Sequence, residues 1–168
     1  KIKSKFGYKY IQNQIEKFSK TKILIVGELI FDEYCFGNII GKSGKEPHLV
    51  LKENFTELYV GGSGAIARNI SSFVKNVQLI APFGDEAFLK QALKKNFDKN
   101  IFKNFLKPKK NFSSIIKKRF IDEISSYKMF GSYLIPERPE KQFSNKLISK
   151  IKSKLPTTDM IIVCDYGH

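Results

Sequence analysis

The chain has 168 residues, 42% of them hydrophobic, and its 30 lysines and arginines against 16 acidic residues give a formal net charge of +14. It can bury one core, and it has neither the ~20 consecutive apolar residues of a membrane helix nor a secretory signal, so we expect no membrane association. Only Arg68, Arg119 and Arg138 are arginines and the lysines are spread along the chain, which favours a solvated basic surface over a nucleic-acid partner.

Residues 1–21 carry apolar side chains at three- and four-residue intervals, which predicts one amphipathic helix. These side chains are Tyr8, Ile11, Ile15 and Phe18. We expect this segment to be a helical extension that packs on the domain, or a linker to a preceding one. The run Ile23–Val26 is wholly apolar and ends at Gly27, which is typical of a buried parallel strand.

The next segments mix aromatic and β-branched residues with polar ones. Residues 31–36 and 49–60 are therefore predicted to be short strands at a sheet edge, separated by the loop Gly41–Pro47. A helix over residues 64–75 follows, because apolar side chains recur there with helical spacing. It would bury Ile66, Ile70 and Phe73.

The second half of the chain continues this alternation. Further strands are predicted at Val77–Ala81, Ser114–Ile121 and Tyr127–Leu134, with a fully buried one at Met160–Cys164. One helix is expected from about Asp85, with Phe88, Leu89, Ala92 and Leu93 inward, and another that ends at Pro156 and buries Phe143, Leu147, Ile148 and Ile151. Strands that alternate with helices of this length indicate an α/β layered sheet.

The glycine-rich turn Gly61–Gly64 stands directly before the first of these helices. Glycine lets a backbone pass close to a ligand, and the N–H groups at a helix start point at whatever binds there. The turn therefore predicts a small-molecule site. Gly62–Ala67 also fits the dinucleotide pattern G-x-G-x-x-A, but more than thirty residues separate it from the first buried strand, which that pattern should follow at once.

Two other motifs have ordinary interpretations. Gly37–Ser43 differs from a phosphate-binding P-loop, because three residues lie between its glycines where four are needed. Cys35 and Cys164 lie in different apolar segments without metal-ligand neighbours, so we expect buried, reduced thiols and no metal site. His48 is expected at the surface.

Three motifs then occur in a defined order. Gly27–Asp32 places an acid just beyond the first strand, Gly61-Gly62 follows the edge strands, and Phe83–Glu86 closes the next strand. Together they resemble the ribokinase-like (PfkB) family of sugar kinases. The chain is also similar to the heptose-phosphate kinase domains that are joined to a nucleotidyltransferase. That likeness rests on Gly27–Asp32, Gly44–Pro47, Lys117–Phe120 and Asp165–Gly167, and it runs from about Lys22 to His168.

The resemblance implies a three-layer α/β/α sandwich with a small β lid, truncated before its C-terminal half. Residues 22–168 would be the N-terminal portion of the kinase domain, and residues 31–36 and 49–60 would form the lid. In the family the lid covers the sugar and often pairs two subunits, so a homodimer through the lid is implied. A fused nucleotidyltransferase domain is implied by the bifunctional branch.

The resemblance also implies a cytoplasmic enzyme that transfers the γ-phosphate of ATP, with Mg²⁺, to a hydroxyl of a sugar or sugar phosphate. Asp32 stands at the family's sugar-binding aspartate, and Gly61 and Gly62 match the diglycine beneath the sugar. Candidates for a substrate phosphate are Arg119, Lys42 and Lys45. The family's catalytic base and nucleotide site belong to a Gly-Ala-Gly-Asp turn that would lie beyond His168, so we expect these 168 residues alone to be inactive.

Two positions depart from the family pattern. Ala65 stands where the family usually has an asparagine whose amide binds sugar hydroxyls, and His168 stands where the heptose kinases often carry lysine. His168 is either a phosphate ligand when protonated or an ordinary loop residue. A non-catalytic sugar-binding or regulatory module and a dinucleotide-binding oxidoreductase stay open as alternatives.

Overall fold

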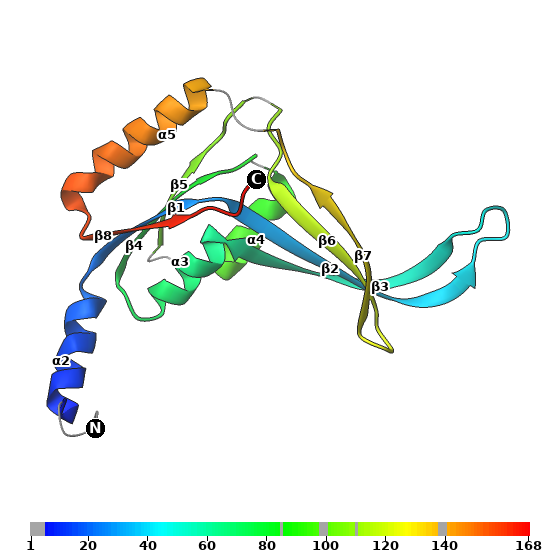
Figure 1. The fold of residues 1–168 in the computed structure, drawn as a ribbon, viewed down its shortest axis with the longest axis horizontal. Helices are drawn as coiled ribbons and strands as arrows, with labels where there is room; N and C mark the ends of the chain where they lie inside the picture. The colour runs from blue at the N-terminus through cyan, green and yellow to red at the C-terminus, as the bar shows by residue number, and fades with distance from the viewer. Residues whose placement is uncertain (1–5, 85, 98–100, 110, 138–140) are drawn as a thin grey trace.

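The structure, a computed structural model, describes residues 6–84, 86–97, 101–109, 111–137 and 141–168. The first five residues of the predicted N-terminal extension and Asp85, near which a helix was expected to begin, lie outside the described residues. Figure 1 shows the helices gathered at one end of the molecule and a long β-hairpin extending from the other.

The strands form two four-stranded sheets. The first sheet is parallel, with the order β5-β4-β1-β8, and the second has the order β3-β2-β6-β7. In the second sheet β2 pairs with β6 in parallel, and its other pairs are antiparallel. The strands are β1 (Lys22–Gly27), β2 (Leu29–Lys42), β3 (Leu49–Gly62), β4 (Asn76–Pro82), β5 (Ile101–Leu106), β6 (Ile115–Asp122), β7 (Tyr127–Leu134) and β8 (Met160–Cys164).

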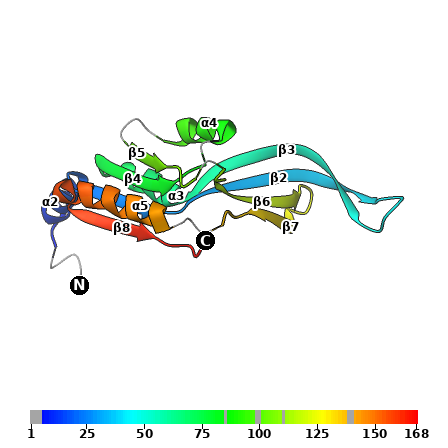
Figure 2. The ribbon, with the colours of Figure 1, turned by 90° about the horizontal axis from the view of Figure 1, so that it is seen from above.

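Helices lie on both faces of the first sheet, as Figure 2 shows for α4 and α5. The helices are α2 (Tyr8–Ser19), α3 (Ser63–Ser71), α4 (Ala87–Asn96) and α5 (Lys141–Lys154), followed by the 3₁₀ turn η1 (Leu155–Thr157). Side chains of α3 and α4 share a core with Ile23 and Ile25, whereas α5 packs on Leu24 and Val26. Because β1 is covered on both faces, all four of its apolar residues are buried, and the predicted layered α/β sheet is confirmed.

The hairpin is longer than the predicted edge strands. β2 and β3 have 14 residues each, and they leave the core together, run past β6 and β7, and turn at residues 43–48. The expected lid is therefore a hairpin arm whose β2 pairs with β6 over only its inner part, from Ile30 to Gly37, and β7 pairs with β6 in turn. β5 was not predicted at all, because Lys103 and Asn104 interrupt its apolar pattern.

Several burial predictions were wrong. β8 is an edge strand of its sheet, so Met160, Ile161 and Val163 are 42%, 41% and 74% exposed, and of its five residues Cys164 alone is buried. Phe73 is exposed because α3 ends at Ser71, before the predicted end of the helix. Phe88 and Ile148 are exposed because each stands next in sequence to the residue that faces the core, and adjacent residues of a helix point in different directions.

Other expectations agree with the structure. Cys35 and Cys164 are buried and free, and burial raises the pKa of both thiols. His48 is exposed in the hairpin loop. The N-terminal helix forms, and it contacts the domain through Phe18, whose ring stacks on Phe73 at 5.8 Å. In the described part of the chain, no helix is both long enough and apolar enough to cross a membrane.

Candidate functional site

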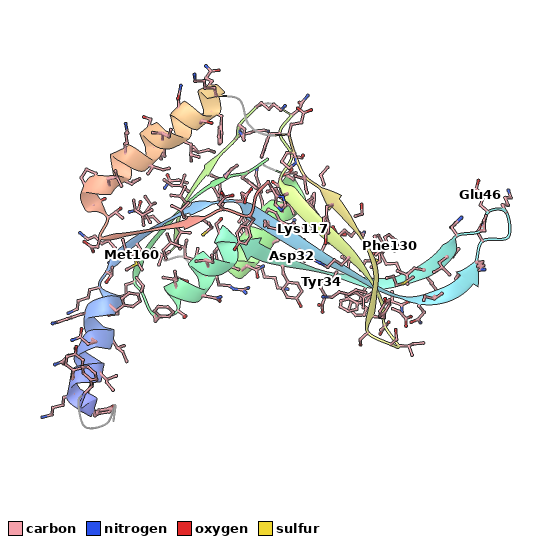
Figure 3. All side chains as sticks on the ribbon, in the orientation of Figure 1. Asp32, Tyr34, Glu46, Lys117, Phe130 and Met160 are labelled. Atoms are coloured by element: carbon pink, nitrogen blue, oxygen red, sulfur yellow. The ribbon has the colours of Figure 1, made fainter. Side chains whose placement is uncertain are left out.

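Asp32 lies where the hairpin leaves the core. Side chains alternate along β2, so Phe31 faces the core while Asp32 and Tyr34 face the opposite side. The register pairs Asp32 with Lys117 and Tyr34 with Arg119 on β6, and paired residues in a sheet share a face. Figure 3 shows Asp32, Tyr34 and Lys117 close together at this point.

The structure brings Asp32 directly over the diglycine turn. A Cβ atom added to Gly61 would overlap the Oδ2 atom of Asp32. Gly62 has a φ of +57°, and a Cβ there would overlap the carbonyl of Glu28. Backbone therefore requires glycine at position 62, whereas glycine at position 61 lets Asp32 keep its present position. The Asp32 carboxylate thus lies against the main chain of the turn at the base of the hairpin.

Arg119 pairs with the other oxygen of the same carboxylate. Its Nη1 donates to Asp32 Oδ1 at 2.6 Å, and its guanidinium carbon lies 5.3 Å from the ring centroid of Tyr34 and 5.7 Å from that of Tyr133. Burial alone would lower the pKa of Arg119. The hydrogen bond and charge of Asp32 outweigh that effect and raise this pKa above its ordinary value. Arg119 is thus a permanent cation held against Asp32.

The lysines proposed for a substrate phosphate do not gather at this point. Lys42 ends β2 and Lys45 lies in the loop at the hairpin tip, which Figure 3 shows well away from Asp32 at the label of Glu46. Lys117, which the sequence did not single out as a ligand, is instead the cross-strand partner of Asp32, and its Nζ lies 5.6 Å from the Tyr133 ring centroid. In the sequence, only the two-residue spacing of Lys117 and Arg119 indicates that their side chains lie on the same face of the sheet.

Glu28 joins the diglycine turn to the segment after β8. Its carboxylate accepts the N–H groups of Tyr166 and His168 at 2.5 and 2.7 Å, while its carbonyl accepts the N–H of Ser63 at 2.9 Å. His168 therefore lies near the diglycine turn, on a small cavity of about 40 Å³ that Glu28 also lines. Its Nε2 atom is buried without a hydrogen-bond partner in the described structure.

Two features bear on the expected cofactors. Among the described residues, no three carboxylate, histidine or cysteine side chains lie close enough together to hold a metal ion. Ala65, in the first turn of α3, carries no group that could bind a hydroxyl.

Solved carbohydrate kinases share the fold of this chain. Phosphofructokinase-2 from Escherichia coli, solved in complex with substrates and products, matches the chain with a TM-score of 0.61 and 14% identity, over 86% of this chain and 44% of the kinase. A carbohydrate kinase from Agrobacterium tumefaciens matches with a TM-score of 0.58 and 14% identity, over 85% of this chain and 45% of the kinase. The chain thus has the ribokinase-like α/β fold that the sequence predicted.

Relatives in sequence narrow the resemblance. The Bifunctional protein HldE of Rhodopseudomonas palustris (strain BisB18) is 25% identical over 149 residues, which are 88% of this chain and 30% of the relative. HldE of Campylobacter concisus (strain 13826) is 31% identical over 102 residues, 61% of this chain and 22% of the relative. No protein-family model matches the chain. The predicted resemblance to ribokinase-like (PfkB) sugar kinases is confirmed, and the chain spans less than a third of the length of these curated relatives.

Proposed function

We propose that the chain forms the acceptor-binding part of a cytoplasmic carbohydrate kinase. The whole protein would transfer the γ-phosphate of ATP, with Mg²⁺, to a hydroxyl of a sugar or sugar phosphate, and a nucleotidyltransferase domain would complete it. The observation that carries this proposal is the Asp32 carboxylate lying over the Gly61–Gly62 main chain at the base of a hairpin lid. Asp32, Gly61, Gly62 and Arg119 belong to the proposed site.

The described residues account for the acceptor side of the reaction. The Oδ2 atom of Asp32 accepts a hydrogen bond from an acceptor hydroxyl, and the lack of a Cβ on Gly61 lets this oxygen lie close to the main chain of the turn. The acceptor oxygen forms a bond to the γ-phosphorus as the bond from that phosphorus to ADP breaks, and the hydroxyl proton passes to a base outside these 168 residues. Holding the hydroxyl in place is the contribution of this part of the chain.

The hairpin supplies the cover. A kinase must keep water away from the transferred phosphoryl group, and a lid that closes over the acceptor does so. Tyr34, Tyr59 and Tyr133 line the lid face that carries Asp32, since their register partners lie on that face. Aromatic rings of this kind pack against the apolar faces of sugar rings while their hydroxyls stay polar.

The direct test is ADP release by the full-length protein with ATP and Mg²⁺. The acceptors would be fructose, mannose and sedoheptulose, each offered free and as its terminal phosphate. We expect ADP release above the ATP-only rate with at least one of them. We also expect no ADP release from the 168 residues alone.

Sugar binding without ADP release would instead favour the second candidate, a non-catalytic sugar-binding module. Ala65 favours that candidate because its side chain cannot bind a hydroxyl. A change in NADH fluorescence on titration with the protein would favour the dinucleotide alternative, since a sugar kinase should give no response.

We also propose that two copies pair through the hairpin. Beyond β6 the arm has only two strands, and an isolated two-stranded hairpin is marginally stable in water. It nonetheless exposes large apolar side chains that a second copy would cover. These are Ile39, Ile40 and Leu49, which are 44%, 63% and 58% exposed.

Ile40→Lys should therefore shift the protein from dimer to monomer in size-exclusion chromatography with light scattering. A charge placed in a buried apolar contact costs several kcal/mol, enough to weaken the dimer about 100-fold or more. Ile148→Lys, which places the same charge on the exposed face of α5, is the control and should leave the dimer intact. A wild-type protein that is monomeric at micromolar concentration would contradict the proposal.

A further inference from the structure

We infer that Arg119 is a positioning residue, which holds the Asp32 carboxylate so that Oδ1 is occupied and Oδ2 faces the acceptor over Gly61. This inference rests on the proposed function. It assigns the two oxygens of one carboxylate to different partners, and it makes Arg119 act through Asp32 instead of through a contact with the substrate.

The contacts of the carboxylate are divided between its two oxygens. Arg119 Nη1 donates to Oδ1, and Oδ2 is the atom that a side chain on Gly61 would meet first. The same Nη1 atom lies 3.4 Å from the carbonyl of Lys117, so the guanidinium is anchored to its own strand as well as to β2. A carboxylate held at one oxygen presents the other in a fixed direction, which is what orienting a hydroxyl requires.

Two tyrosines hold the guanidinium in turn. Tyr34 comes from β2 and Tyr133 from β7, the two neighbours of β6, and both rings lie within 6 Å of the guanidinium carbon. Tyr34 also meets Tyr59 of β3 edge-on, with their centroids 5.8 Å apart. All four strands of the lid sheet therefore contribute to the orientation of one carboxylate.

The opposite face of the sheet carries a matched ion pair. Lys118 and Glu33 are the neighbouring residues on the same two strands, and their charged atoms are 2.9 Å apart. Their side chains are 29% and 21% exposed, against 21% and 23% for Arg119 and Asp32. Because residues next to one another on a strand point to opposite faces, the Lys118 pair links β2 to β6 on the face away from Gly61. It provides an internal control for the loss of an ion pair alone.

A direct phosphate contact is the competing role for Arg119. Its Nη1 atom already donates to the Asp32 carboxylate and to the Lys117 carbonyl. The Lys117 side chain lies on the same face and, among the described residues, pairs with no carboxylate. A phosphate of the acceptor would therefore meet Lys117. A positioning residue and a phosphate ligand differ in one measurable way, because only the second distinguishes a sugar from its phosphate.

The experiment measures kcat/KM in the full-length protein for the best acceptor of the fructose, mannose and sedoheptulose panel, both free and phosphorylated. We expect Arg119→Gln to lower both values by the same factor, about tenfold, through a higher KM for the acceptor with the KM for ATP unchanged. Arg119→Lys should recover most of the loss, and Lys118→Gln should change neither value. In an Asp32→Asn background, Arg119→Gln should add less than about a twofold effect.

Each outcome bears on a different statement. A loss confined to the phosphorylated acceptor, or a tenfold effect that persists in the Asp32→Asn background, would overturn the positioning role and leave the kinase proposal intact. An equal loss in Lys118→Gln would also overturn it, since the effect would then follow from any broken pair between β2 and β6. Failure of the wild-type protein to use any acceptor of the panel would overturn the proposed function and this inference with it.

Discussion

Replacing Asp32 with asparagine should lower kcat/KM for the acceptor by about 100-fold, because a hydrogen bond to a charged group contributes about 1.5–3 kcal/mol and each 1.4 kcal/mol is a factor of ten. Asparagine keeps one acceptor oxygen, which can serve either Arg119 or a substrate hydroxyl but not both. Its NH₂ group would face the remaining partner as a second donor. The measurement is ADP release at acceptor concentrations well below KM.

Glu33→Gln is the matched control for this substitution. Glu33 is the next residue on β2 and pairs with Lys118 on the opposite face, so the change removes the same charge without touching the proposed site. We expect its kcat/KM to stay near that of the wild type. Equal activities for Asp32→Asn and the wild type would show that Asp32 does not bind the acceptor. Equal losses in both variants would assign the effect to the sheet instead.

Gly61→Ala should also reduce kcat/KM by about 100-fold, because a displacement of about 1 Å in a positioning group can have that effect. The new methyl group would occupy the space of Asp32 Oδ2, so the carboxylate must move away from the acceptor or lose its bond to Arg119. The stability of the fold should change less than the activity, since the atom displaced is the end of a side chain. Acceptor kinetics and thermal unfolding of the same variant measure the two effects.

Two further glycine variants separate the causes. Gly44→Ala lies in the hairpin loop, where a Cβ meets nothing within 4 Å, so both activity and stability should be unchanged. Gly62→Ala should lower stability as well as activity, because its backbone angles (φ +57°, ψ −138°) are unfavourable for alanine by about 1–3 kcal/mol and its Cβ would meet backbone. Full activity in Gly61→Ala would contradict the close placement of Asp32 over the turn.

The order of motifs along the chain carries the resemblance from which the fold and the meeting of Asp32 with Gly61 were predicted. The apolar run Ile23–Val26 was predicted to be a buried strand, and β2, which carries Asp32, begins at the carboxyl edge of that strand's sheet. The glycine turn returns to the same edge because β3 pairs with β2 in an antiparallel direction. Local pattern thus predicts the strand, whereas the meeting of Asp32 with the diglycine is what the family resemblance implies.

The contacts between strands could not be predicted in the same way. The partners of Asp32 on β6 depend on the register of two strands that are more than eighty residues apart in the sequence. A shift of one residue would have placed Lys118, not Lys117, opposite Asp32. The burial of side chains on β8 and α3 depends on which elements cover them. The periodicity of apolar residues does not contain that information. The outer part of β2 was missed because Gly37, Asn38 and Gly41 interrupt its apolar residues, whereas β3 nearly matches the predicted strand at 49–60.

The irregularities in the hairpin have a mechanical consequence. The pairing of β2 with β3 shifts between Phe36 and Gly37 and again between Ile39 and Gly41, both beyond Asp32 on the way to the tip. Such irregularities bend a hairpin and increase its twist, whereas residues 29–36 pair regularly on the core side of them. The direction in which the arm projects is therefore set beyond Asp32, and the carboxylate lies in the regularly paired base of the hairpin.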